Sequence, residues 1–168
     1  MSLNKIFKNY YFETILILII FFLDRISKLF VIHKDKLNFN SEIYSSKFLN
    51  IHLIWNEGIA FGLFSFNENY LYNGLTFLIF LVIIFIIFML RKSDPLRKYA
   101  LLLVLGGALG NFFDRIIYKA VPDFIDFHVG NFHWFIFNVS DIFITIGIIL
   151  MIIIEIINKP EVNNNEKI

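Results

Sequence analysis

The feature that most limits how this chain can fold is a set of four long apolar stretches. A helix that crosses the hydrocarbon core of a bilayer, roughly 30 Å thick, needs about 20 mostly apolar residues. We place such helices at about residues 10–32, 72–90, 99–118 and 137–157. Hydrophobic residues make up 58% of the chain, more than a soluble core requires. The sequence therefore predicts an all-α integral membrane protein with four transmembrane helices, folded as a single membrane domain over 1–168.

The positions of Lys and Arg predict the orientation, because short cytoplasmic loops accumulate these residues. One side of the membrane receives Lys5, Lys8, Arg91, Lys92, Arg97, Lys98, Lys159 and Lys167. The other side receives Lys34, Lys36, Lys47 and Lys119, although its connecting segments are longer. We therefore expect both termini to be cytoplasmic, with residues 158–168 as a cytoplasmic tail.

Two segments are expected on the extracytoplasmic side. Residues 33–71 form the first, and we predict a small β insertion there because residues 48–55 partly alternate between apolar and polar. Asn56 and Gly58 follow directly and favour a turn. Residues 121–137 form the second segment, which is aromatic and interrupted by proline and glycine, and which suits the lipid headgroup layer.

Composition excludes several kinds of chemistry. A net charge of +1, with no basic run away from the membrane flanks, argues against a nucleic-acid partner. The chain has no cysteine, which excludes a thiolate nucleophile and a cysteine-ligated metal. The four histidines lack the spacing of helical metal ligands, and no serine lies in a GxSxG turn. We therefore expect neither a metal nor another cofactor.

Polar residues of several predicted elements converge at one depth, near the outer edge of the membrane. The depth follows from a rise of about 1.5 Å per helical residue and from the alternating directions of the helices. The residues are Asp24 and Lys28 in the first helix, Asn111 and Arg115 in the third, Asn138 and Asp141 in the first turn of the fourth, and Asp123 just before it. Ionisable groups in a membrane span are costly, so this convergence requires an explanation, either functional or structural.

Asp123 and Asp141 have two interpretations. Two carboxyl groups a few ångströms apart cannot both ionise, so one would keep a proton while the other takes a proton from water. Such a pair can hydrolyse an amide without a metal. Alternatively, Asn138 caps the fourth helix, Asp141 is an acidic residue favoured in its first turn, and Asp123 is solvated.

The remaining polar residues also have structural interpretations. Asp24 and Lys28 lie four residues apart, which favours a helical ion pair in which Lys28 reaches toward lipid phosphate. Arg115 either anchors the third helix at the membrane edge or holds the backbone of the next segment. Gly107 and Gly110 lie on one face of that helix, where small residues allow a neighbouring helix to approach closely.

Five sequence motifs, taken together, resemble the bacterial lipoprotein signal peptidases, also called signal peptidase II. The resemblance covers almost the whole chain. The motifs are DRISK at Asp24–Lys28, WNEGIAFG at Trp55–Gly62, GGALGNFFDR at Gly106–Arg115, VPDF at Val121–Phe124 and FNVSD at Phe137–Asp141.

The resemblance implies an aspartic endopeptidase that removes the signal peptide of diacylglyceryl-modified prolipoproteins, cutting just before the lipidated cysteine. Asp123 and Asp141 match the catalytic aspartates of the family. Further residues match positions that the family uses to support the catalytic pair, to maintain the fold or to bind the substrate: Asp24, Lys28, Asn56, Gly58, Asn111, Arg115 and Asn138.

The resemblance also implies a location and a set of partners. We expect a multi-pass protein of the bacterial cytoplasmic membrane, with the active site near the extracytoplasmic face. Its partners would be prolipoproteins and membrane lipid, and we expect a monomer. The family fold adds a small β-sheet and a helical arm on the outer surface, which fits residues 33–71.

Three residues depart from the family pattern. Ile59 stands where a small residue is usual, Pro122 precedes the first catalytic aspartate, and Ser140 occupies a position that is commonly alanine. These changes remove no group that the chemistry needs.

Two other functions fit a small polytopic protein. A transporter or a proton-conducting protein also carries ionisable residues in its spans. Its path should continue to the inner face, whereas the inner halves of these helices are almost wholly apolar. An assembly factor without catalysis would use the polar cluster only to hold helices together.

Overall fold

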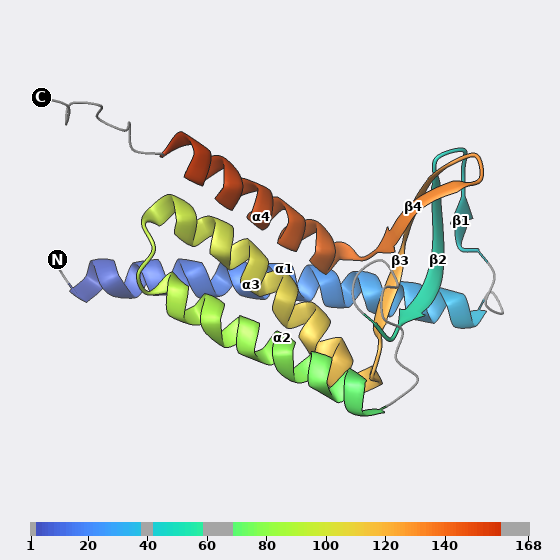
Figure 1. The fold of residues 1–168 in the computed structure, drawn as a ribbon, viewed down its shortest axis with the longest axis horizontal. Helices are drawn as coiled ribbons and strands as arrows, with labels where there is room; N and C mark the ends of the chain where they lie inside the picture. Colours follow the sequence, from blue (N-terminus) through green and yellow to red (C-terminus); the bar gives the residue numbers. More distant parts are fainter. Residues whose placement is uncertain (1–2, 38–41, 59–68, 159–168) are drawn as a thin grey trace, which may run out of the picture.

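The structure is a computed structural model that describes residues 3–37, 42–58 and 69–158. Within these residues the chain forms four helices and a small antiparallel sheet (Figure 1). The helices are α1 (Leu3–Leu37), α2 (Asn69–Leu90), α3 (Pro95–Tyr118) and α4 (Val139–Ile157). The strands are β1 (Tyr44–Ser45), β2 (Leu49–Asn56), β3 (Val121–Val129) and β4 (Phe132–Phe137).

The bounds of three helices differ from the predicted ones, and capping residues explain where α3 and α4 begin. α1 runs beyond the predicted 10–32 at both ends. α3 starts at Pro95, earlier than predicted, because Asp94 caps its first turn and proline is well suited to the first helical position. α4 starts at Val139 and not at residue 137, because Asn138 is its N-cap.

Three helical stretches are long and apolar enough to cross a membrane: Tyr72–Leu90, Pro95–Tyr118 and Val139–Ile157. This finding concerns only the part of the chain that the structure describes, and it leaves the predicted count of four spans open. α1 is also long, but it carries Asp24, Arg25 and Lys28 in its second half.

α3 is the central helix and contacts α1, α2 and α4. Its contact with α2 forms an apolar core around Ile83, Ile86, Leu101 and Leu105. The outward faces of the helices are also apolar, as Phe77, Leu78 and Phe85 of α2 show. Helices that are apolar both toward their neighbours and toward their surroundings are expected in a lipid environment.

The sheet has the strand order β1-β2-β3-β4, and all neighbouring strands are antiparallel. The prediction that the β element lies within 33–71 was wrong in extent, because β3 and β4 come from residues 121–137. Pro122 did not prevent a strand because it lies near the start of β3, before Ile125, where the pairing with β4 begins, so that this part of β3 has a neighbouring strand on one side only. Gly130, with a φ of 60°, forms the turn between β3 and β4.

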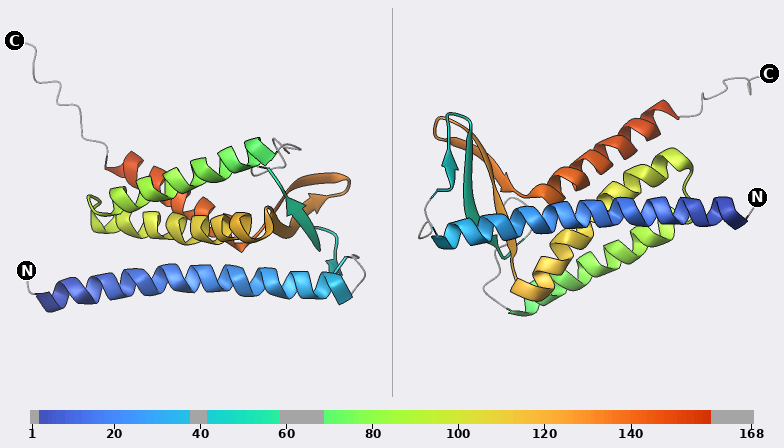
Figure 2. Two further views of the ribbon diagram at one scale, coloured as in Figure 1. Left: turned by 90° about the horizontal axis from the view of Figure 1, so that it is seen from below. Right: turned by 180° about the vertical axis from the view of Figure 1, so that it is seen from behind.

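The sheet lies at one end of the helix bundle (Figure 2). The first turns of α1 and the last turns of α4 lie at the opposite end (Figure 1). β3 follows α3 directly, and β4 leads directly into α4. The polar residues of the helices and those of the sheet therefore meet where bundle and sheet join.

Candidate active site

Asp123 is held in β3 by two amide side chains. Its carboxylate accepts hydrogen bonds from Asn56 Nδ2 at 2.8 Å and from Asn138 Nδ2 at 2.6 Å. Asn56 is the last residue of β2, the neighbouring strand, in which Ile54 pairs with Asp123. The Asn56 Oδ1 accepts a bond from the Gly58 backbone N–H at 2.9 Å, which fixes the amide's orientation. Only 4% of Asp123 is exposed.

Asp141 lies in the first turn of α4 and forms a capping box with Asn138. Asp141 Oδ2 accepts from the Asn138 backbone N–H at 3.1 Å, and Asn138 Oδ1 accepts from the Asp141 backbone N–H at 3.2 Å. Asp141 Oδ1 accepts from Asn111 Nδ2 at 2.8 Å. Asn138 therefore bonds to both aspartates. The capping interpretation is confirmed for Asn138 and Asp141, but its expectation of a solvated Asp123 was wrong, because Asp123 is buried.

The surroundings of Asp123 favour its protonated form. Burial, and after it the negative charge of Asp141, raise the pKa of Asp123, and the net effect of its surroundings is a rise from 3.8 to about 6. The hydrogen bonds from Asn56 and Asn138 and the charge of Lys28 lower this pKa and only partly offset the rise. Burial and a like charge nearby are the two conditions under which a carboxyl group keeps its proton.

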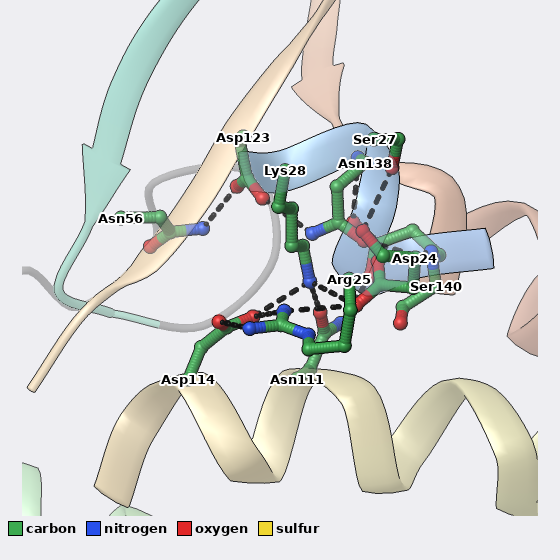
Figure 3. A network of polar contacts seen from close by, with 11 residues as sticks. Asp24, Arg25, Ser27, Lys28, Asn56, Asn111, Asp114, Asp123, Asn138 and Ser140 are labelled. Carbon is green, nitrogen blue, oxygen red and sulfur yellow. Dashed lines mark hydrogen bonds and ion pairs between the residues drawn. The ribbon is translucent and has the colours of Figure 1, made fainter. Parts of the chain in front are cut away.

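Four buried charged residues of α1 and α3 form what we call the ion cluster (Figure 3). Its members are Asp24, Arg25, Lys28 and Asp114. Lys28 Nζ lies 2.9 Å from Asp24 Oδ2 and 2.7 Å from Asp114 Oδ2. Arg25 lies 2.6 Å from Asp114 and 3.0 Å from Asp24. The cluster contains equal numbers of positive and negative charges.

The ion cluster is connected to the aspartate pair at two points. Lys28 donates a hydrogen bond to Asn111 Oδ1 at 2.8 Å, and Asn111 in turn donates to Asp141. The backbone N–H of Ser140 donates to Asp24 Oδ1 at 3.0 Å, at the first turn of α4. Both points hold α1 and α3 against the helix that carries Asp141.

Arg115 supports the other side of the site. Its guanidinium donates to the backbone carbonyl of Gly58 at 2.6 Å, and the Tyr72 hydroxyl donates to the backbone carbonyl of Arg115 at 3.2 Å. Because Gly58 also orients Asn56, Arg115 holds the chain segment that carries the amide partner of Asp123.

All nine residues singled out from the sequence belong to one connected hydrogen-bond network. The prediction that Lys28 reaches toward lipid phosphate was wrong, because Lys28 is fully buried and turned toward α3. Sequence reasoning missed Arg25, Asp114 and Tyr72 as members of this network. Asp114 follows Asn111 by one helical turn, which was the available signal. The network gives the positions and contacts of these residues, and their catalytic or supporting roles stay predictions.

Two of the three departures from the family pattern lie in the described residues. Pro122 pairs with Trp55 in the β2–β3 ladder. Ser140 is fully buried, and its hydroxyl has no hydrogen-bond partner within the described ranges. Ile59 lies outside the described residues. In the same described ranges, no three histidine or acidic side chains are grouped so that they could hold a metal ion.

Two solved structures share this fold, and both are described as a bacterial membrane enzyme determined by the in meso method. The one at 2.3 Å resolution is 28% identical, with a TM-score of 0.66, and the match covers 89% of this chain and 92% of that chain. The one at 1.9 Å resolution is 26% identical, with a TM-score of 0.68 and coverages of 88% and 94%. The fold is therefore that of a membrane enzyme.

The family follows from the sequence comparisons. Residues 16–157 match the family described as signal peptidase (SPase) II. The lipoprotein signal peptidase of Pelagibacter ubique (strain HTCC1062) is 50% identical over 166 residues, which covers 98% of this chain and 99% of that protein. The lipoprotein signal peptidase of Anaplasma phagocytophilum (strain HZ) is 37% identical, with coverages of 84% and 89%. The chain belongs to the signal peptidase II family, a family of membrane-bound aspartic peptidases.

Proposed function

We propose that Asp123 and Asp141 are the catalytic pair of an endopeptidase that removes the signal peptide of diacylglyceryl-modified prolipoproteins, just before the lipidated cysteine. The observation that carries the proposal is the position of Asn138, which bonds to both carboxylates. Its side chain and backbone together set how far apart the two acids lie. The family to which the chain belongs supports the substrate.

The chemistry needs one proton on the pair. The ionised carboxylate takes a proton from water, and the resulting hydroxide attacks the carbonyl carbon of the scissile amide. The protonated carboxyl donates its proton to the carbonyl oxygen. When the tetrahedral intermediate collapses, a proton passes to the leaving nitrogen and the C–N bond breaks. The raised pKa of Asp123 supports a pair that retains one proton under mildly acidic to neutral conditions.

For the membrane placement we propose four spans in the bacterial cytoplasmic membrane, with both termini cytoplasmic and the sheet on the extracytoplasmic side. α1 can serve as the fourth span because its charged residues pair with α3 in the ion cluster and do not face lipid. The start of α1 and the end of α4 lie at the end of the bundle opposite to the sheet. The sequence assigns the excess of Lys and Arg to that side, which supports this orientation.

The depth of the pair supports a lipidated substrate. Asp123 and Asp141 lie where β3 approaches the first turn of α4, at the sheet end of the bundle. A lipidated cysteine keeps its acyl chains in the outer leaflet, so its peptide bond would reach this level without leaving the membrane. We also propose a monomer as the active unit.

The test compares Asp123→Asn and Asp141→Asn with the unchanged protein, each purified in detergent and given a synthetic lipidated prolipoprotein. Asparagine keeps the shape of the side chain but cannot exchange the proton. We expect each variant to lose cleavage by about 10³-fold or more, with little change in the amount of protein inserted into the membrane.

Asp126→Asn is the matched control, because Asp126 is also buried in β3 but contacts His133, at 2.7 Å. We expect this variant to keep most of its activity. If Asp141→Asn cleaves at the unchanged rate, the catalytic pair is refuted. If Asp126→Asn loses as much activity as the other two, the loss reports a damaged strand and not the chemistry.

A further inference from the structure

Arg25 is a buried cation that the proposed chemistry does not use. Its guanidinium donates to Asp114 at 2.6 Å and to Asp24 at 3.0 Å, and only 9% of its side chain is exposed. It also lies over the ring of Phe113, with 5.1 Å between the guanidinium carbon and the ring centroid. These contacts come from both α1 and α3, so the position of Arg25 is built into the packing of the two helices.

The charge count of the ion cluster shows what Arg25 contributes. Asp24 and Asp114 carry two negative charges, and Lys28 balances only one of them. Arg25 balances the other. Without its charge, the cluster would hold one uncompensated negative charge in a buried setting, where charges interact strongly.

This charge would lie close to the catalytic pair. Asp114 bonds to Lys28, Lys28 to Asn111, and Asn111 to Asp141. Three hydrogen bonds and one amide group span this path, so the bonded carboxylate oxygens of Asp114 and Asp141 lie at most about 11 Å apart. At that distance, and at an effective dielectric constant of about 20, one unit charge shifts a titration by about one pH unit.

The other charged and titratable groups around the pair come from each element that packs against it. They are Asp24 and Lys28 of α1, Tyr72 of α2, and Asp114 and Arg115 of α3. Arg115 balances the single negative charge of a pair that holds one proton. The whole site is therefore neutral only when Arg25 is present.

We propose that Arg25 is a positioning residue that sets the pH range of catalysis by keeping the ion cluster neutral beside Asp141. The inference depends on the proposed catalytic pair. Arg25 acts through Asp114, Lys28 and Asn111 and does not touch the substrate.

The first variant is Arg25→Gln, which keeps a side chain that can donate hydrogen bonds but removes the charge. Because an extra negative charge makes the pair hold its protons more tightly, we expect both limbs of the pH profile of kcat to move to higher pH, by about one unit. KM should change little. Arg25→Lys keeps the charge and should retain the original profile.

The decisive comparison uses Asp114. Asp114→Asn alone leaves an excess positive charge and should move the profile to lower pH. The double variant Arg25→Gln with Asp114→Asn is neutral again and should return the profile to its original position, even though both ion-pair partners are lost. Arg97→Gln, which removes an exposed ion pair with Glu155 at 2.8 Å, is the matched control and should leave the profile unchanged.

An unshifted profile in Arg25→Gln, or a double variant shifted as far as the single one, overturns the inference. If Arg25→Gln does not accumulate in the membrane, recovery of protein and of the original profile in the double variant supports it, and failure of the double variant also overturns it. Loss of activity in Asp141→Asn with no shift in Arg25→Gln would refute this inference alone. Unchanged activity in Asp141→Asn would refute the catalytic pair itself.

Discussion

Gly110 of α3 faces both α1 and α4, and its replacement by alanine tests whether this packing maintains the site. A Cβ atom at Gly110 would overlap the Ser140 hydroxyl and lie 2.7 Å from Asp24 Oδ2. Both neighbours belong to the bond that joins α1 to α4, from the Ser140 backbone N–H to Asp24 Oδ1 at 3.0 Å. The added methyl group therefore acts on the link between the ion cluster and the helix that carries Asp141.

The magnitude follows from three contributions. Overpacking a close contact costs about 1–3 kcal/mol, and loss of the hydrogen bond from Ser140 costs about 1 kcal/mol more. Alanine favours a helix over glycine by up to about 1 kcal/mol, which offsets part of this cost. We expect Gly110→Ala to lower the free energy of unfolding by about 2 kcal/mol and the thermal midpoint in detergent by about 5 °C. Cleavage should fall more steeply, because Asp141 moves with α4.

Two other glycines, Gly74 and Gly107, provide controls for Gly110→Ala. At Gly74, nothing in the described part of the chain lies within 4 Å of an added Cβ, so Gly74→Ala should leave stability unchanged or raise it slightly. At Gly107 the added Cβ would lie 2.5 Å from the backbone oxygen of Ser140. Ser140→Ala should therefore relieve part of the Gly110→Ala defect and none of the Gly107→Ala defect. A Gly110→Ala protein as stable and as active as Gly74→Ala would refute the reasoning.

Two further predictions concern the aspartate pair. The pKa of Asp123 rises from 3.8 to about 6 on folding, so the stability that its proton provides is complete below about pH 4 and is lost as the pH rises through about 6. The thermal midpoint of the unchanged protein should fall relative to that of Asp123→Asn over this interval, by the equivalent of about 3 kcal/mol, whereas a constant difference would contradict the shift. Asn138→Ala removes the N-cap of α4 and the bonds from its side chain to both acids, so it should cost about 2 kcal/mol and most of the activity. Asn158→Ala, at the exposed C-cap of the same helix, is its control, and equal effects of the two changes would show that Asn138 acts only as a cap.

That the polar residues of the site share one level of the helix bundle could be predicted from the sequence, because helical rise and alternating helix direction together fix their relative heights. Asp24, Lys28 and Asn111 share one level in the structure for this reason, and they bond to one another there. Which side chain bonds to which could not be predicted in the same way. Lys28 is long enough to reach either lipid phosphate or α3, and only the close packing of α1 on α3 selects the second.

The sheet shows a different limit. Pro122 and Gly130 interrupt residues 121–137, and interruption of this kind favours an irregular loop in a sequence read by itself. In the structure Pro122 lies near the start of β3 and Gly130 in the hairpin turn, two positions that a strand pair accepts. Arg25 was missed for a related reason. Its importance comes from the charge of Asp114, a residue 89 positions away that only the fold brings within reach.

The β3–β4 hairpin, which is local in sequence, positions the two aspartates, whereas the charged residues around them come from distant parts of the chain. β3 and β4 pair with Ile125 opposite Phe137, so the hairpin brings Asp123 beside the residue at which α4 begins. A shift of this register by one residue would turn the Asp123 side chain to the other face of the sheet. The hairpin can therefore set the separation of the two acids without the other helices. Lys28 and Asn111 reach the pair only through the packing of α1 and α3. Variants that change only a charge on α1 or α3, such as Arg25→Gln, should accordingly change the pH at which the pair works before they change its geometry, whereas Gly110→Ala displaces α4 itself.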